Sequence, residues 1–293
     1  MTTPRISGAF LAIPFLALSV AACSSSDLPI GNTQTWASVR VANLAPDIPA
    51  LDFCFALQGT GNWIGPQMKA MGETGGIVYG NPARQVGKYA GLIAAPWDVR
   101  IVVPNAADCT APITPDGTMV VGTNGWYTVA VTGLATSTSA PHAIYTWSDD
   151  DIAPAGQVKL RFVNAAMASA TAASPPLDGG TGSPTGLPTP FRPVFPSVLF
   201  PGPAAPSTTV DANGYATFAP TDLVAGTTVF TACLSGALPG PVTCPVSQTY
   251  GGPPLPALYV GTTFAVGGGP SPYRFLSCVD NVPSQVTNFC TCL

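Results

Sequence analysis

Val39-Arg40-Val41-Ala42-Asn43 and Leu160-Arg161-Phe162-Val163-Asn164 are the two stretches that decide the fold. In each, apolar residues alternate with polar or small ones, which is the period-two pattern of a half-buried strand. The same alternation recurs in four segments rich in aromatic and β-branched residues: Leu51–Phe55, Asp98–Val103, Trp126–Val131 and Ile144–Trp147. Turn residues separate the segments, and only 66–73 has the pattern of a helical turn. The sequence therefore predicts an all-β fold built as antiparallel sandwiches or barrels.

The order of these segments occurs twice along the chain. Arg161 follows Arg40 by 121 positions, and Asp280 follows Asp149 by 131 positions, so the second copy has a longer middle. Two copies of one fold, joined by an acidic and proline-ended stretch at 149–154, explain the repeated order.

We therefore expect two tandem β-sandwich domains, the first at 36–150 and the second at 151–293. The second domain includes a stretch at about 172–206 that is crowded with Pro, Gly, Ser and Thr. We expect this stretch to be a long flexible loop or an edge, because proline cannot donate to a central ladder. The end of the chain, 288–293, carries two cysteines and is expected to be a tail held by a disulfide.

The N-terminus has the layout of an export signal. Arg5 precedes an apolar run from Ala9 to Ala22, small residues lead into Cys23, and serines follow. This layout is typical of a secretory signal, and it resembles the lipobox of bacterial lipoproteins. We expect residues 1–22 to be a signal peptide and 23–35 a tether lipidated at Cys23. The resemblance implies an exported protein that is lipid-anchored to the bacterial outer membrane, on its periplasmic or surface face.

The composition restricts the classes of partner. Charged residues make up only 8% of the chain, which has three lysines and a formal net charge of −4. Because there is no basic stripe, the chain lacks the electrostatic footprint of a nucleic-acid-binding protein. After the signal, no apolar run reaches the ~18 residues that a membrane-spanning helix needs. We therefore expect attachment through the lipid alone, and no nucleic-acid partner.

Eight cysteines are present, and seven remain if Cys23 carries lipid. An exported protein keeps disulfides in an oxidising compartment, and an odd number leaves one thiol over. Spacing does not fix the pairing. Our preferred pairs are Cys54–Cys109 and Cys233–Cys244, with Cys278 joined to either Cys290 or Cys292.

Catalytic chemistry finds little support in the sequence. His142 is the only histidine and lies at a turn, so we interpret it as a turn residue rather than a member of a catalytic triad. No Gly-x-Ser-x-Gly motif is present. Cys290-Thr291-Cys292 is the nearest approach to a zinc motif, but no histidine is nearby, so disulfides are favoured. We expect no catalytic residue, no cofactor and no metal site.

The acidic residues allow two interpretations. Asp47 and Asp52 are five residues apart, a spacing open to a carboxylate pair or a calcium site. The structural alternative, which we favour, is that Asp47 caps its own turn and Asp52 faces solvent. We likewise interpret Asp149-Asp150-Asp151 as a solvated linker rather than a metal site.

All five tryptophans lie in the first copy. Such residues usually pack in cores, although clusters of them also form carbohydrate platforms. Trp63 lies in a glycine-rich loop, and we take it as the candidate ligand contact.

The stretch from Val39 to Cys54 resembles the opening of the domain-of-unknown-function family 4397. The resemblance rests on four features: a strand ending in a small polar residue, the Pro46-Asp47 turn, a second proline and the Leu51-Asp52 step into the next strand. Gly125–Gly133 resembles a later strand of that family, and Lys159–Ala166 resembles the start of a second domain. The second copy departs from the pattern, since 167–170 replaces the Pro-Asp turn. The resemblance implies secreted or surface-attached bacterial proteins with Ig-like β-sandwich domains, and it implies no activity.

These observations favour a non-enzymatic cell-envelope lipoprotein that acts as a structural, adhesion or assembly module. The alternative is an extracellular ligand- or glycan-binding lipoprotein that uses loops of the first domain.

Overall fold

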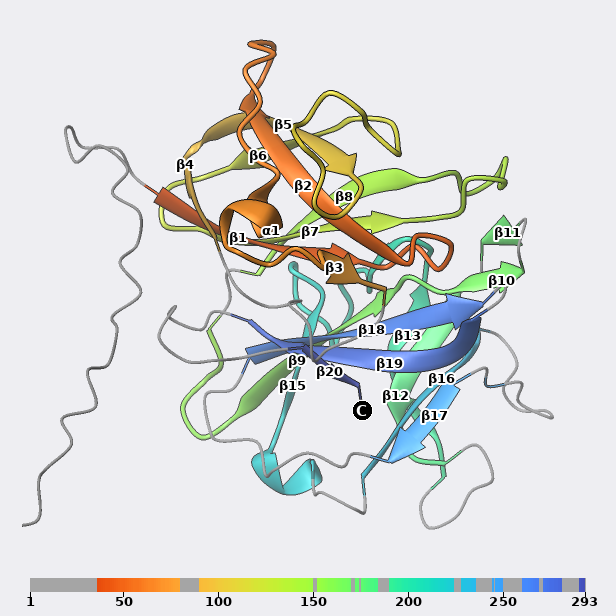
Figure 1. Cartoon of the computed structure of the whole chain (residues 1–293). Coiled ribbons are helices and arrows are strands. Elements are labelled where there is room, and N and C mark those ends of the chain that lie inside the picture. The colour runs from red at the N-terminus through yellow and green to blue at the C-terminus, as the bar shows by residue number, and fades with distance from the viewer. Residues whose placement is uncertain are drawn as a thin grey trace, which may run out of the picture. The chain divides into compact units, whose positions relative to one another are not determined.

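A computed structural model describes twelve parts of the chain: 36–79, 90–149, 152–169, 172–173, 175–183, 190–223, 228–235, 244, 246–249, 260–268, 271–280 and 290–292. The predicted signal peptide, Cys23 and the tether lie outside the described residues. Residues 35–293 form one compact unit, and its described part is nearly all β (Figure 1). The described helices are the single turn α1, Gln67–Ala70, and a short 3-10 turn at Pro220–Asp222. The predictions of an all-β fold and of a helical turn within 66–73 are therefore confirmed.

The described strands of the first repeat form two four-stranded sheets. In each repeat, the sheet that faces the other repeat is called the inner sheet, and the remaining one is called the outer sheet. The first outer sheet has the order β3-β2-β5-β6, with β3 at Ile77–Val78, β2 at Ala50–Leu57, β5 at Ala95–Val102 and β6 at Gly117–Val121. The first inner sheet has the order β4-β1-β7-β8, with β4 at Ala90–Ile93, β1 at Trp36–Asn43, β7 at Trp126–Thr132 and β8 at Ala143–Ser148. Alternate residues of these strands point between the two sheets, so Val39, Phe53 and Val129 share one buried core.

The second repeat follows the same plan with additions. The second inner sheet has the order β14-β9-β18-β19-β20, and β15 also pairs with β9. Its strands are β14 at Gly202–Pro203, β15 at Tyr215–Phe218, β9 at Val158–Asn164, β18 at Val260–Gly268, β19 at Ser271–Val279 and β20 at Cys290–Cys292. The second outer sheet has the order β13-β12-β16-β17, with β13 at Arg192–Val198, β12 at Leu177–Thr181, β16 at Val229–Leu234 and β17 at Val246–Thr249. A small hairpin joins β10, Met167–Ser169, to β11, Ala172–Ala173.

Among the described strands, one pair in each repeat is parallel, in contrast to the wholly antiparallel sheets expected. β1 runs parallel to β7, and β9 runs parallel to β18. In both repeats this pair joins the first strand to a strand that comes much later in the chain. A hairpin could not make such a connection, because parallel neighbours need a long crossover.

The stretch 172–206 is more ordered than expected. Its glycine-containing strand β12 is central in the second outer sheet, where it pairs with β13 on one side and β16 on the other. The expectation of one long flexible loop was therefore wrong for these residues. The expectation that proline-containing segments lie at a sheet edge is met by β13, which carries Pro193 and Pro196 and is an edge strand among the described strands.

β12 is the counterpart of β2. In both repeats a Leu-Asp step enters the strand, as Leu51-Asp52 and as Leu177-Asp178, and both leucines are fully buried. In the first repeat the next residue is the core residue Phe53, whereas in the second it is Gly179. The ring of Phe162 fills the space above Gly179, because a Cβ there would lie 2.6 Å from that ring.

The two inner sheets contact each other through their remaining faces. Trp147 on β8 packs against Phe264 on β18, with ring centroids 5.9 Å apart. Val163, Val266 and Leu276 of the second repeat belong to the same buried cluster as the core of the first repeat. The two repeats are therefore joined by a buried surface as well as by the linker.

Candidate functional site

A buried cluster of charges lies between the two inner sheets, where each repeat contributes an arginine, a threonine and an aspartate. These residues, called the charge cluster below, are Arg40, Thr128, Asp149, Arg161, Thr262 and Asp280. All six are at most 2% exposed. The arginines lie on β1 and β9, the first strand of each repeat. Asp149 directly follows β8, and Asp280 directly follows β19.

Within each repeat the three residues form a hydrogen-bonded chain. Arg40 Nε donates to Thr128 Oγ1 at 2.6 Å, and the Thr128 hydroxyl donates to the Asp149 carboxylate. In the second repeat Arg161 Nε donates to Thr262 Oγ1 at 3.0 Å, and that hydroxyl donates to Asp280 Oδ2 at 2.6 Å. The two repeats thus build the same local arrangement from residues that are far apart in the sequence.

Ion pairs also connect the two repeats. Arg40 of the first repeat donates to Asp280 of the second, and Arg161 of the second donates to Asp149 of the first. Arg40 Nη2 also lies 3.4 Å from Asp149 Oδ2. Two positive and two negative charges are therefore buried together without net charge. A buried ion pair adds little net stability, but removal of one partner leaves an uncompensated charge and is costly.

Tyr215 on β15 completes the second half of the cluster. Its hydroxyl donates to Asp280 Oδ2 at 2.7 Å, and the Arg161 guanidinium lies 4.8 Å from its ring centroid. Burial and the nearby Asp280 carboxylate raise the pKa of Tyr215 far above its usual range, so the hydroxyl stays a donor. Burial is also the main cause of the raised pKa of Asp280; the arginines oppose that rise, and Asp149 adds to it. Burial lowers the pKa of Arg161, but Tyr215 and the two aspartates outweigh it and keep this guanidinium charged.

The charge cluster corrects our interpretation of Asp149. We expected a solvated linker residue, but Asp149 is fully buried and holds both repeats together. Its backbone N–H donates to Trp126 O, and that of Asp280 donates to Val260 O, so the backbones of the two aspartates are held in the same way. The available signal was the equivalent order of an arginine and an aspartate in the two copies.

Trp63, the candidate ligand contact, is only partly exposed and packs beside a disulfide. It lies against the buried cluster of Cys54, Val102 and Cys109. The guanidinium of Arg100 lies 4.1 Å from its ring centroid, and Arg100 forms a two-point ion pair with Asp116. One face of the indole is thus covered by a side chain of the same chain, which leaves less surface for a ligand than a free loop tryptophan would have.

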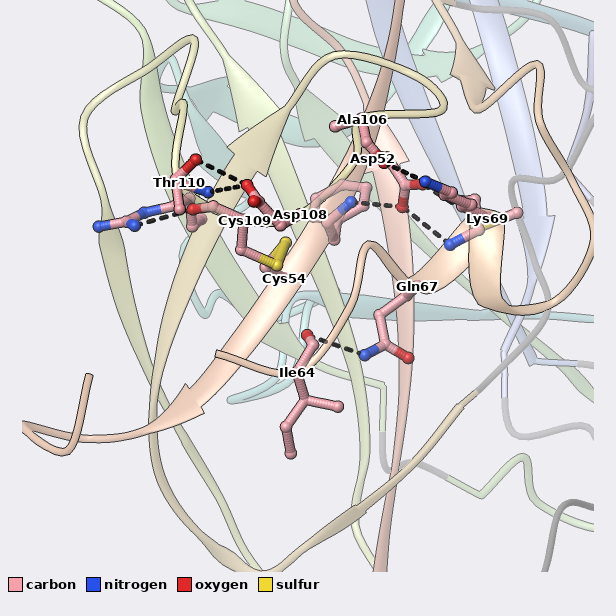
Figure 2. The surroundings of a disulfide bond; sticks show 12 residues. Asp52, Cys54, Ile64, Gln67, Lys69, Ala106, Asp108, Cys109 and Thr110 are labelled. Atoms are coloured by element: carbon pink, nitrogen blue, oxygen red, sulfur yellow. Dashed lines mark hydrogen bonds between the residues drawn. A yellow bond between two sulfur atoms is a disulfide. The ribbon is translucent and has the colours of Figure 1, made fainter. Parts of the chain in front are cut away.

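Asp52 has a structural role that differs from the one expected. It does not face solvent, because its side chain is fully buried. The carboxylate accepts hydrogen bonds from the backbone N–H groups of Phe53, Met68 and Lys69, at 2.7, 2.8 and 3.0 Å (Figure 2). It therefore satisfies donors at the start of α1 that would otherwise lie unpaired. Asp52 and Asp47 have separate partners and do not form a carboxylate pair.

His142 pairs with Asp47. Its Nε2 lies 2.7 Å from Asp47 Oδ1, while Asp47 Oδ2 accepts from the Ala135 N–H at 2.8 Å. Asp47 therefore ties its turn to the loop 133–142 rather than capping itself. Gly133 begins that loop at φ +88°, and a Cβ there would lie 2.2 Å from the Pro141 carbonyl oxygen. The interpretation of His142 as a residue of a turn agrees with this placement.

The cysteines agree with the preferred pairing where they are described. Cys54 is joined to Cys109, as Figure 2 shows, and Cys233 is joined to Cys244. Cys278 is disulfide-bonded as well. Its expected partners are Cys290 and Cys292, whose backbone on β20 pairs with β19 but whose side chains lie outside the description.

A small cavity lies in the core of the second repeat. It measures about 20 Å³, and five of its eleven lining residues are phenylalanines: Phe162, Phe195, Phe218, Phe230 and Phe275. This volume holds roughly one water molecule, and an apolar cavity of this kind stays dry. It lies beside Gly180 and Thr181 of β12, which supply little side-chain volume, so we interpret it as a packing gap.

Within the described ranges, no three His, Cys, Asp or Glu side chains come together as a metal site. The same ranges contain no helix with the length and hydropathy to cross a membrane. No family model matches the chain, and no curated protein matches it either.

Proposed function

We propose that this chain is a non-enzymatic, lipid-anchored protein of the bacterial cell envelope, in which two β-repeats form a rigid structural, adhesion or assembly module. The same proposal places the lipid on Cys23 and the protein at the outer membrane. It also keeps the resemblance of both repeats to the domain-of-unknown-function family 4397 as a prediction.

The observation that carries the proposal is the buried disulfide between Cys54 and Cys109. Cys54 is fully buried and Cys109 is 5% exposed. Disulfides of this kind persist in exported proteins, whereas cytosolic thiols are kept reduced. The export signal expected at 1–22 and the disulfides therefore point to the same compartment.

A structural role is favoured because the buried charged side chains described above bond to other groups of the fold. Asp52 caps α1, Asp47 binds His142, and the four charges of the charge cluster neutralise one another. Rigidity is what a spacer or adhesion module requires. The glycan-binding alternative rests on Trp63, and the packing of Arg100 against its ring does not favour that alternative.

The test is intact-mass analysis of the protein from membranes of its native host. We expect the mature chain to begin at an acylated Cys23, to carry disulfides and to fractionate with the outer membrane. The matched variant Cys23→Ser should lose the added mass of the acyl chains and the membrane association. A native chain that keeps Met1 and reduced cysteines would contradict the proposal. A glycan array probed with the wild type and Trp63→Ala separates the alternative, which requires binding that this substitution abolishes.

A further inference from the structure

Among the described strands, β6 lies at an edge of the first outer sheet. It pairs with β5 in the first outer sheet, and no described strand lies on its other side. Its sequence is Gly-Thr-Met-Val-Val and contains neither a charge nor a proline. Edge strands expose unpaired N–H and C=O groups and are usually protected by such residues.

The register with β5 shows which groups of β6 face outward. Val120 lies opposite Pro96, which has no N–H, and the Pro96 carbonyl accepts from Gln58 N–H at 3.1 Å on the β2 side. The pair Pro96–Val120 is therefore not hydrogen-bonded. Because hydrogen-bonded and non-hydrogen-bonded pairs alternate in an antiparallel ladder, the same holds for Thr118. The backbone N–H and C=O groups of Thr118 and Val120 thus point away from β5.

The side chains at these two positions are also accessible. Thr118 is exposed, and Val120 is 70% exposed, the second-highest value among the large exposed apolar residues of the described chain. The edge strand β13 differs, because Arg192, Pro193 and Pro196 protect it. Among the described residues, the edge of β6 therefore lacks the charged residue and the prolines that protect β13.

We propose that this edge binds the same edge of a second copy of the chain. A two-fold axis through Met119 would place Thr118 of each copy opposite Val120 of the other. Both pairs would then exchange both backbone hydrogen bonds, because in both copies the free groups belong to these two residues. The facing side chains are β-branched and uncharged, which suits a cross-strand pair. The dimer does not depend on the lipid anchor, so it can fail while the proposed envelope function stands.

The first test is sedimentation equilibrium of the full chain in a density-matched detergent. We expect a monomer–dimer equilibrium whose dissociation constant rises at least about tenfold in Val120→Lys, because the dimer would then hold two like charges, one on either side of the axis. The matched control is Leu199→Lys in the second repeat, where the leucine is 65% exposed. It should leave the constant unchanged. A monomer at every concentration, or a dimer equally insensitive to both substitutions, would overturn the proposal.

The second test fixes the register. Thr118→Cys and Val120→Cys proteins are prepared separately and then mixed under oxidising conditions. Facing residues of a hydrogen-bonded pair have Cα atoms about 5.5 Å apart, within disulfide range, whereas each position is too far from itself across the axis. The cross-linked dimer should form in the mixture and not in either protein alone. Equal cross-linking in the unmixed proteins, or a monomer that binds an extended peptide along β6 instead, would contradict self-pairing.

Discussion

Arg161 donates a hydrogen bond to the carboxylate of Asp149, although the two residues belong to different repeats. The reciprocal bond runs from Arg40 to Asp280. Each repeat thus supplies an arginine that pairs with the buried aspartate of the other repeat. The repeats are therefore parts of one folded unit, in agreement with the compactness of residues 35–293.

Removing one charge from the charge cluster should be far more costly than removing an exposed one. We expect Arg40→Met to lower the free energy of unfolding by about 3–5 kcal/mol, because Asp280 is left buried with less compensation. The control Arg100→Met breaks the partly exposed pair with Asp116 and should cost about 1 kcal/mol or less. Urea unfolding measures both. Equal losses in the two variants would show that the charge cluster has no special weight.

The charges should also be coupled to each other. In a double-mutant cycle of Arg40→Met and Asp280→Asn, the double variant should be more stable than the sum of the single losses predicts, by about 1–3 kcal/mol. The physical reason is that the second substitution removes the charge left unpaired by the first. Additive losses would mean that the two residues do not interact in the folded protein.

The contributions of Asp280 and Asp211 to the free energy of unfolding should depend on pH with opposite signs. Burial raises the pKa of Asp280, so its contribution to stability is present below about pH 4 and is lost as the pH rises through its folded pKa. Burial also acts to raise the pKa of Asp211, but the hydrogen bond from Lys159 helps to lower it on balance. That contribution is present above about pH 4 and is lost as the pH falls through the folded pKa.

The measurement is the stability difference between the wild type and each Asp→Asn variant across this pH range. The difference for Asp280→Asn should shrink as the pH rises from about 4, and that for Asp211→Asn should shrink as the pH falls below about 4. Slopes of the same sign would refute one of the two assignments.

The two disulfides should differ in their effect on stability. Cys54–Cys109 closes 55 residues and Cys233–Cys244 closes 11. In the chain-entropy model, their removal costs about 4 and about 3 kcal/mol at 25 °C. Double Cys→Ala variants of each pair, compared by urea unfolding, test this order. A larger loss of stability on removing the disulfide of the shorter loop would argue against chain entropy as the main source of stabilisation.

Asp52→Ala should destabilise the first repeat by about 3 kcal/mol, because three N–H groups lose a charged acceptor. Thermal unfolding followed by circular dichroism measures the loss. Asp108→Ala is the control, since that side chain bonds only within an exposed turn around Thr110. An equal shift in both variants would be incompatible with the role assigned to Asp52.

The sequence predicted the strands that alternate clearly, such as β1, β2, β5 and β7, because burial on one face imposes period two. It did not predict β12, because Gly179 and Gly180 have low strand propensity and prolines surround them. Hydrogen bonds from β13 and β16 on both sides override that propensity. The burial of Asp149 was missed for a similar reason. An Asp-Asp-Asp run has the local composition of a solvated linker, and the arginines that neutralise Asp149 come from other strands.

The measurement that tests the account most directly is tryptophan fluorescence during urea unfolding of Phe195→Ala. All five tryptophans lie in the first repeat, whereas Phe195 is buried in the core of the second. The substitution should cost about 3–5 kcal/mol. If the charge cluster makes the repeats one cooperative unit, the fluorescence midpoint will fall together with that of far-UV circular dichroism. A fluorescence transition that stays at the wild-type midpoint, with a separate earlier transition in circular dichroism, would contradict the account.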